Sequence, residues 1–115
     1  MTFDQLQEKI KAWGASKGIT NKKKHSGKRT IQRYAQTLKV QEESGELCKA
    51  ILKDDEPTIK DGIGDTIVTL ILLAEIQGYS LEECLLIAWN EIKSREGKVV
   101  NGKKPSETQI LDQNA

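Results

Sequence analysis

Acidic residues at helical spacing are the feature of this 115-residue sequence with the clearest chemical meaning. Glu43 and Glu46 are three positions apart in the segment EESGE that begins at Glu42, and Asp61 and Asp65 are four apart. On a helix, such positions are neighbours on one surface, so each pair places two carboxylates side by side. Crowded like charges need a cation, and carboxylate oxygens are ligands that Mg²⁺ and Mn²⁺ prefer. The sequence therefore predicts a metal site built from two helices.

The glutamates also lie in line with apolar positions. Leu47 is four residues beyond Glu43, and Ala50 is four beyond Glu46. These carboxylates are thus expected beside inward-facing side chains, where an unpaired charge is unfavourable. Helical bundles build metal sites from carboxylates that project inward, and a metal with open coordination positions can hold phosphates and activate water. The chemistry that fits is hydrolysis of a phosphoanhydride bond.

A simpler interpretation stays open for the glutamates. Glu42, Glu43 and Glu46 can form a solvated helix face, with Lys39 and Lys49 as surface ion-pair partners. Two acidic clusters, both beside core stripes on adjacent antiparallel helices, favour the metal site over this interpretation.

The positions of apolar residues predict the elements that carry these acids. Phe3, Leu6, Ile10 and Trp13 recur at three- and four-residue steps, as in an amphipathic helix. The same periodicity predicts four helices in all, at residues 2–17, 30–53, 57–77 and 81–96. Gly18 and Gly78 are suited to end helices, and Pro57 is suited to begin one.

The third predicted helix is apolar on every side at residues 67–74, which is typical of an element surrounded by others. In a chain this short, we expect a second subunit to supply part of that surround. The fold prediction is an all-α, four-helix bundle at residues 1–100, completed as a homo-dimer or tetramer. Residues 101–115 are polar and are expected to form a flexible tail.

Charge and hydropathy argue against several classes of function. The formal net charge is +1, from 18 basic and 17 acidic residues, which disfavours nucleic acid as a partner. The one basic cluster, at residues 22–29, falls where a loop is expected. The N-terminus carries no signal-peptide pattern, and residues 67–74 are too few to span a bilayer. We expect a cytoplasmic protein with no membrane partner.

Three segments together resemble a known family. Residues 39–47, the triplet Ile63-Gly64-Asp65 and residues 90–95 are similar to the MazG-like branch of the all-α nucleoside triphosphate pyrophosphohydrolases. The family signature is EExxE followed by ExxD on the next helix. The first half is complete here, but Gly62 stands where the second half has glutamate. Asp61 can replace that ligand; otherwise the site binds metal more weakly, or activity has been lost.

The resemblance implies a role for each candidate site residue. The metal, Mg²⁺ or Mn²⁺, would be held by Glu43, Glu46 and Asp65, with Asp61 as the replacement ligand. Glu42 would support these ligands or orient the attacking water. The positions implied for substrate binding are Asn90, Lys93 and Arg95, which would contact phosphates, and Trp13, which can stack on a base. Two structural alternatives stay open. Lys93 can be an exposed cation in the last turn of its helix, and Trp13 can be a core residue.

The implied reaction converts a nucleoside triphosphate to its monophosphate and pyrophosphate, as in house-cleaning of the nucleotide pool. The main rival is a non-catalytic helical oligomer that binds a nucleotide or a partner protein, its activity lost through Gly62. A third hypothesis, nucleic-acid binding through residues 22–29, predicts steep salt dependence and disagrees with the near-zero net charge.

Overall fold

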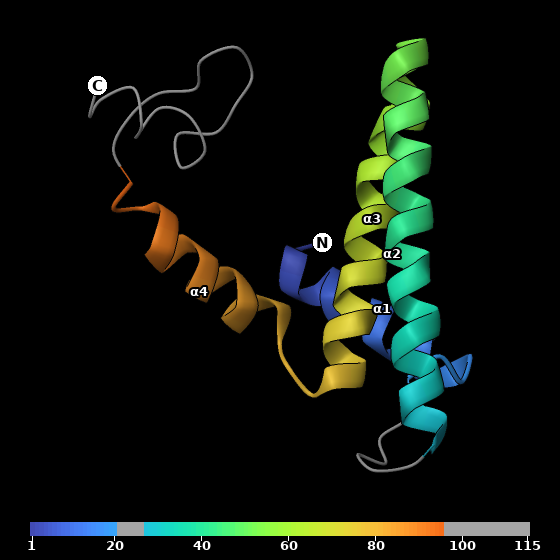
Figure 1. Ribbon diagram of the computed structural model, residues 1–115, viewed down its shortest axis with the longest axis vertical. Helices are drawn as coiled ribbons and strands as arrows, with labels where there is room; N and C mark the ends of the chain where they lie inside the picture. Colours follow the sequence, from blue (N-terminus) through green and yellow to red (C-terminus); the bar gives the residue numbers. More distant parts are fainter. Residues whose placement is uncertain (21–26, 96–115) are drawn as a thin grey trace. The chain divides into compact units, whose positions relative to one another are not determined.

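The computed structural model describes residues 1–20 and 27–95, with side chains omitted for 27–29, and these residues form four helices and no strand. The helices are α1 (Phe3–Ser16), α2 (Gly27–Lys53), α3 (Glu56–Gln77) and α4 (Leu81–Ile92) (Figure 1). The all-α, four-helix prediction is confirmed. The tail predicted at residues 101–115 lies outside the described residues.

Local sequence explains where most helices begin and end. Thr2 caps α1 through a capping box with Gln5, and Gly18 follows that helix with a φ of 74°. Pro57 lies in the first turn of α3, and Gly78 ends that helix with a φ of 80°. Positive φ values of this kind are strained for residues with a Cβ, so both glycines suit these ends.

Two predicted boundaries were wrong by three or four residues. Helix α2 starts at Gly27 rather than at residue 30. Helix α4 ends at Ile92 rather than at residue 96. Beyond it, the Arg95 N–H donates to the Ile92 carbonyl, and the Ser94 hydroxyl donates to the Glu91 carbonyl. Such turn-like bonds compete with helix continuation.

The described chain divides into two compact units, and the first comprises Met1–Leu81. Within it, α2 and α3 lie side by side, and α1 packs against α3 (Figure 1). Ala50 of α2 is buried together with four residues of α3: Ile71, Leu72, Ala74 and Ile76. Three of these residues, Ile71, Leu72 and Ala74, belong to the apolar run at residues 67–74. Ile67 and Leu70 of the same run are exposed, so the run is not covered on every side within this unit.

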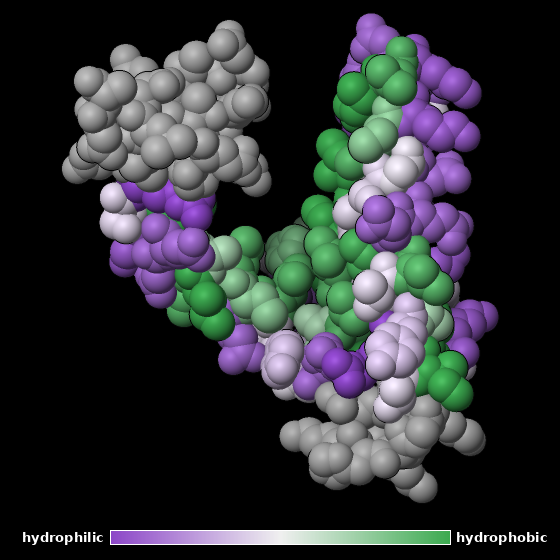
Figure 2. Space-filling view, in the orientation of Figure 1, coloured by the Kyte–Doolittle hydropathy of each residue, from purple (hydrophilic) through white to green (hydrophobic). Residues whose placement is uncertain are grey.

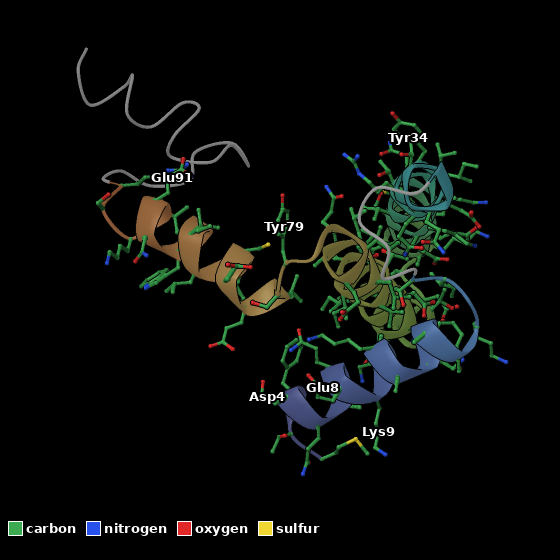
Figure 3. The ribbon with its side chains drawn as sticks, turned by 90° about the horizontal axis from the view of Figure 1, so that it is seen from below. Asp4, Glu8, Lys9, Tyr34, Tyr79 and Glu91 are labelled. Carbon is green, nitrogen blue, oxygen red and sulfur yellow. The ribbon has the colours of Figure 1, made fainter. Side chains whose placement is uncertain are left out.

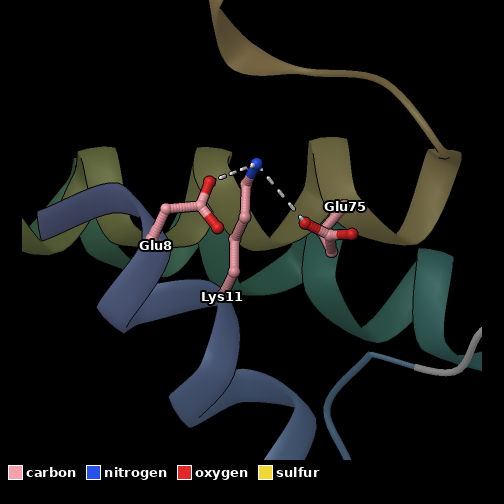
Figure 4. A network of polar contacts seen from close by, with 3 residues as sticks. All are labelled: Glu8, Lys11 and Glu75. Atoms are coloured by element: carbon pink, nitrogen blue, oxygen red, sulfur yellow. Dashed lines mark hydrogen bonds and ion pairs between the residues drawn. The ribbon is translucent and has the colours of Figure 1, made fainter. Parts of the chain in front are cut away.

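Helix α1 reaches α3 through a small residue and an ion pair. A Cβ at Gly14 would lie 2.5 Å from Leu72 Cδ2, so any larger residue here would require the Leu72 side chain to shift. Lys11 Nζ lies 3.4 Å from Glu8 Oε1 and 3.8 Å from Glu75 Oε2, which links the two helices (Figure 4).

Many apolar side chains of the first unit remain exposed. They include residues of α1 and α3 as well as the α2 residues Ile31, Tyr34 and Leu38. Figure 2 shows hydrophobic side chains on the surface of the α2 and α3 pair, and Figure 3 shows Tyr34 projecting away from α3.

The second unit, from Glu82 onward, contains most of α4, in which no residue is buried. Among the described helices, none is both long and apolar enough to cross a membrane.

Candidate active site

A pocket of about 260 Å³ brings side chains of α1, α2 and α3 together. Its polar lining includes Glu43 from α2 and Asp65 from α3, the two carboxylates that the sequence placed on different helices. Lys39, Gln36 and Trp13 line the same pocket. Two of the predicted metal ligands and one predicted substrate-binding residue are therefore found around one cavity.

Helix geometry explains this convergence. On α2, Gln36 and Glu43 are seven residues apart, which returns them to the same face after about two turns. On α3, Asp65 and Thr69 are four apart and also share a face. Because α2 and α3 pack along each other, these two faces meet at the pocket.

Asp61 and Asp65 interact directly on α3. The pKa of Asp65 is raised above its ordinary value of 3.8 by desolvation, then by the negative charge of Asp61 and by a side-chain hydrogen bond with it. Both residues line a second, largely apolar pocket of about 400 Å³ between α1 and α3. The sequence-based expectation that these two carboxylates face the same side is therefore consistent with the structure.

The two remaining acids of the cluster are more exposed. Glu42 Oε2 lies 3.5 Å from Lys39 Nζ, as the solvated-face interpretation anticipated for that pair. Glu46 is exposed and does not line the pocket that contains Glu43. Among the residues at 1–20 and 27–95, no three His, Cys, Asp or Glu side chains are close enough together to hold a metal ion on their own.

Gly62 has a clear structural reason to be glycine. It is buried, and a Cβ at this position would lie 3.2 Å from Leu47 Cδ1 and 3.4 Å from Leu47 Cα. The lack of a side chain lets α3 approach the backbone of α2 closely, one residue beyond Glu46. The position that the family signature gives to a glutamate is thus occupied by a helix-packing contact.

The profile of the MazG nucleotide pyrophosphohydrolase domain matches residues 30–100 of this sequence. The chain belongs to the MazG family. The matched residues contain α3, α4 and all but the first turn of α2, and therefore both pairs of acids. The resemblance found in the EESGE segment and around Asp65 is confirmed.

One curated relative is 34% identical over 73 residues, an uncharacterized 18.2 kDa protein from the rep-hol intergenic region of Haemophilus phage HP1 (strain HP1c1). The aligned region covers 64% of this chain but only 40% of the relative. No solved structure matches the sequence.

Trp13 lies outside the MazG match, and the structure corrects its interpretation as a core residue. Its side chain is 48% exposed and lines the pocket with Glu43 and Asp65. The apolar stripe on α1 that suggested a core position is itself poorly covered, since Phe3 and Leu6 are also exposed. The substrate-binding alternative for Trp13 therefore has the geometry that it needs.

The candidate phosphate-binding residues at the end of the MazG match belong to the second unit. Asn90 and Lys93 are exposed, and Arg95 Nη2 donates to Glu91 Oε1 over 2.8 Å (Figure 3 labels Glu91). The role of these three residues in binding phosphates stays a prediction. The i, i+4 pairing of Arg95 is the surface arrangement expected for a basic residue after a helix end.

Two polar pocket residues were missed by sequence reasoning. Gln36 is only 6% exposed, and its Nε2 donates to the Thr69 carbonyl over 3.1 Å. Both residues line the pocket. The available signal was the spacing of Gln36, two helical turns before Glu43, but one glutamine in a polar stretch is not distinctive enough to single out.

Proposed function

We propose that this MazG-family chain hydrolyses a nucleoside triphosphate with one water molecule, giving the monophosphate and pyrophosphate. The observation that carries the proposal is the shared pocket of Glu43 and Asp65, on two helices of a chain that the family match links to nucleotide pyrophosphohydrolysis. Lys39 and Trp13 around the same pocket offer a cation for phosphates and a ring for a base.

The carboxylates fit Mg²⁺. This ion is usually bound by one or two carboxylates together with substrate phosphates, so a set of three preassembled acids is not required. Glu43 and Asp65 are the proposed principal ligands, with Glu46 and Asp61 as additional ones. The pKa of Asp65 is raised mainly by desolvation and also by the charge of Asp61, and a bound cation would offset both effects, which supports cation binding here. When bound, the metal would neutralise phosphate charge and acidify water.

Other side chains would then position the phosphates and the attacking water. Lys39 lies one turn before Glu43 and would hold a negatively charged phosphate oxygen as a point charge. Glu42, which pairs with Lys39, would fix that lysine or orient the attacking water. Asn90, Lys93 and Arg95 would contact the phosphates, as the family resemblance implies. Catalysis of this kind depends on positioning and charge stabilisation rather than on a covalent intermediate.

A non-catalytic nucleotide-binding protein is the second candidate. Gly62, where the signature has glutamate, is the observation that favours it, because the substitution removes one expected ligand. In that case, the described pocket would still bind a nucleotide but would not turn it over.

The deciding experiment is an assay of pyrophosphate release from a panel of nucleoside triphosphates, with Mg²⁺, Mn²⁺ or chelator. We expect metal-dependent release by the wild type and a loss of at least about a hundredfold in Glu43→Gln and Asp65→Asn, as is common when a charge-stabilising group is removed. Glu56→Gln is the matched control, because Glu56 is an exposed acid of α3 that pairs with Lys60, one turn further along the same helix. Nucleotide binding without release would establish the second candidate instead.

A further inference from the structure

We propose that Gln36 reads the edge of the nucleobase and thereby sets the base preference of this site. The inference rests on the proposed function, since it takes the pocket of Glu43 and Asp65 to be where the nucleotide binds. It goes further by giving the nucleotide a direction along α2. The phosphates lie at the end near Glu43, and the base lies at the end near Gln36.

The environment of Gln36 is the first observation. This side chain is a polar amide more than nine-tenths buried, yet it lines a cavity. Its Nε2 donates to the Thr69 carbonyl over 3.1 Å, and only the NH₂ end of the amide can make that bond. The amide orientation is therefore fixed. Gln36 Oε1 takes no part in that bond.

The groups of this amide that the Thr69 bond does not occupy are suited to recognise a base. Gln36 Oε1 can accept a hydrogen bond, and the second N–H of Nε2 can donate one. A primary amide presents these two groups side by side, which is the arrangement that pairs with a donor and an acceptor on the edge of a base. Because the Thr69 bond holds the amide in place, little side-chain freedom is lost when a base binds.

The position of Gln36 along the pocket is the second observation. It lies seven residues before Glu43, so the two are separated by about 10 Å along the axis of α2. This separation leaves room for a sugar between a phosphate held near Glu43 and a base held near Gln36. Trp13, which lines the same pocket and is half exposed, provides a ring on which that base can stack.

A purely structural role is the alternative that the test must separate. The Gln36–Thr69 bond joins α2 to α3, so its loss would lower stability whether or not a base binds there. A structural role does not, however, distinguish nucleotides that differ by one hydrogen-bond donor. Base discrimination is therefore the decisive measurement.

The experiment compares nucleotide pairs that differ at one donor on the base: ATP with purine riboside triphosphate, CTP with pyrimidin-2-one riboside triphosphate, UTP with its N3-methyl derivative and GTP with its N1-methyl derivative. The kcat/KM ratio within each pair is measured for the wild type and for Gln36→Met, which keeps an unbranched side chain without the amide. Gln32→Met is the matched control. Its amide also donates to a carbonyl, that of Gly18 over 3.0 Å, but Gln32 does not line this pocket.

We expect the wild type to favour the best-hydrolysed parent nucleotide over its analogue by about tenfold, the effect of one hydrogen bond. Gln36→Met should reduce that ratio to within about twofold, and Gln32→Met should leave it unchanged. An unchanged ratio in Gln36→Met would overturn the inference while the hydrolase stands.

Binding of the same pairs as α,β-methylene analogues, measured by calorimetry, separates this inference from the proposed hydrolysis. Discrimination in binding that Gln36→Met abolishes, without pyrophosphate release by the wild type, would support base reading and reject the hydrolase. No binding of any nucleotide would overturn both.

Discussion

At the scale of single residues, the pair of Asp61 and Asp65 is the most informative feature of the site. Desolvation, the charge of Asp61 and a shared hydrogen bond together raise the pKa of Asp65. An acid whose pKa is raised on folding is held less favourably when ionised than when protonated. Ionised Asp65 therefore lowers the free energy of unfolding, which is expected of carboxylates arranged to bind a ligand rather than to stabilise the fold.

This pair predicts a specific dependence of stability on pH. The folded-state pKa of Asp65 lies above 3.8. Protonated Asp65 therefore contributes to the free energy of unfolding, fully below pH 3.8, and this contribution is lost as the pH rises through the raised pKa. The free energy of unfolding of the metal-free protein should thus fall, relative to Asp65→Asn, as the pH rises above about 4. Urea unfolding across that range measures the difference.

Asp61→Asn is the companion variant for this prediction, because it removes the charge that contributes to the shift. The effect of Asp65→Asn on the pH profile should therefore be smaller when Asp61→Asn is already present than in the wild-type background. Parallel pH profiles for the wild type and Asp65→Asn would show that folding does not raise the pKa of Asp65.

At the scale of the helix, alanine substitutions at two glycines of α3 distinguish the effect of intrinsic helix preference from the effect of packing. Both Gly62 and Gly64 lie inside the helix, but a Cβ at Gly64 would meet nothing within 4 Å, whereas one at Gly62 would lie 3.2 Å from Leu47 Cδ1. Gly64→Ala should raise the free energy of unfolding by about 1 kcal/mol, the usual gain for alanine over glycine. Gly62→Ala should gain clearly less, because Leu47 must shift.

Chemical denaturation of the two alanine variants beside the wild type tests this difference. Equal stabilisation in both would mean that α2 and α3 accommodate a side chain at residue 62 without adjustment. Gly62, which stands where the MazG signature has glutamate, would then have no packing explanation.

The periodicity of the sequence predicted the helices well because it reports which face of each helix is apolar. Pro57 and Gly78 located α3 to within one residue, and the four-residue spacing of Asp61 and Asp65 correctly predicted that they share a face. Periodicity does not report which neighbour covers a face. For this reason, the alternative that placed Trp13 in the core was wrong, since the side chain is half exposed, and the buried position of Gln36 was not anticipated.

At the scale of the whole molecule, several of the exposed apolar side chains lie together on one surface rather than singly. Ile31, Tyr34 and Leu38 recur at three- and four-residue steps on one face of α2 and are 69%, 65% and 70% exposed. Scattered exposed apolar residues are normal, but a contiguous group marks an interaction surface. The homo-oligomer predicted from the sequence provides a second copy that would cover this stripe.

We therefore expect the protein to sediment as a dimer or tetramer at micromolar concentration. Leu38→Glu should shift it toward smaller species, because a charge buried between subunits without a partner is strongly unfavourable. Thr37→Glu is the matched control, since it adds the same charge at the adjacent exposed residue, beside the apolar stripe rather than within it. Sedimentation velocity distinguishes the outcomes. A monomeric wild type would refute self-association, and equal dissociation of both variants would mean that added charge, rather than the stripe, controls assembly.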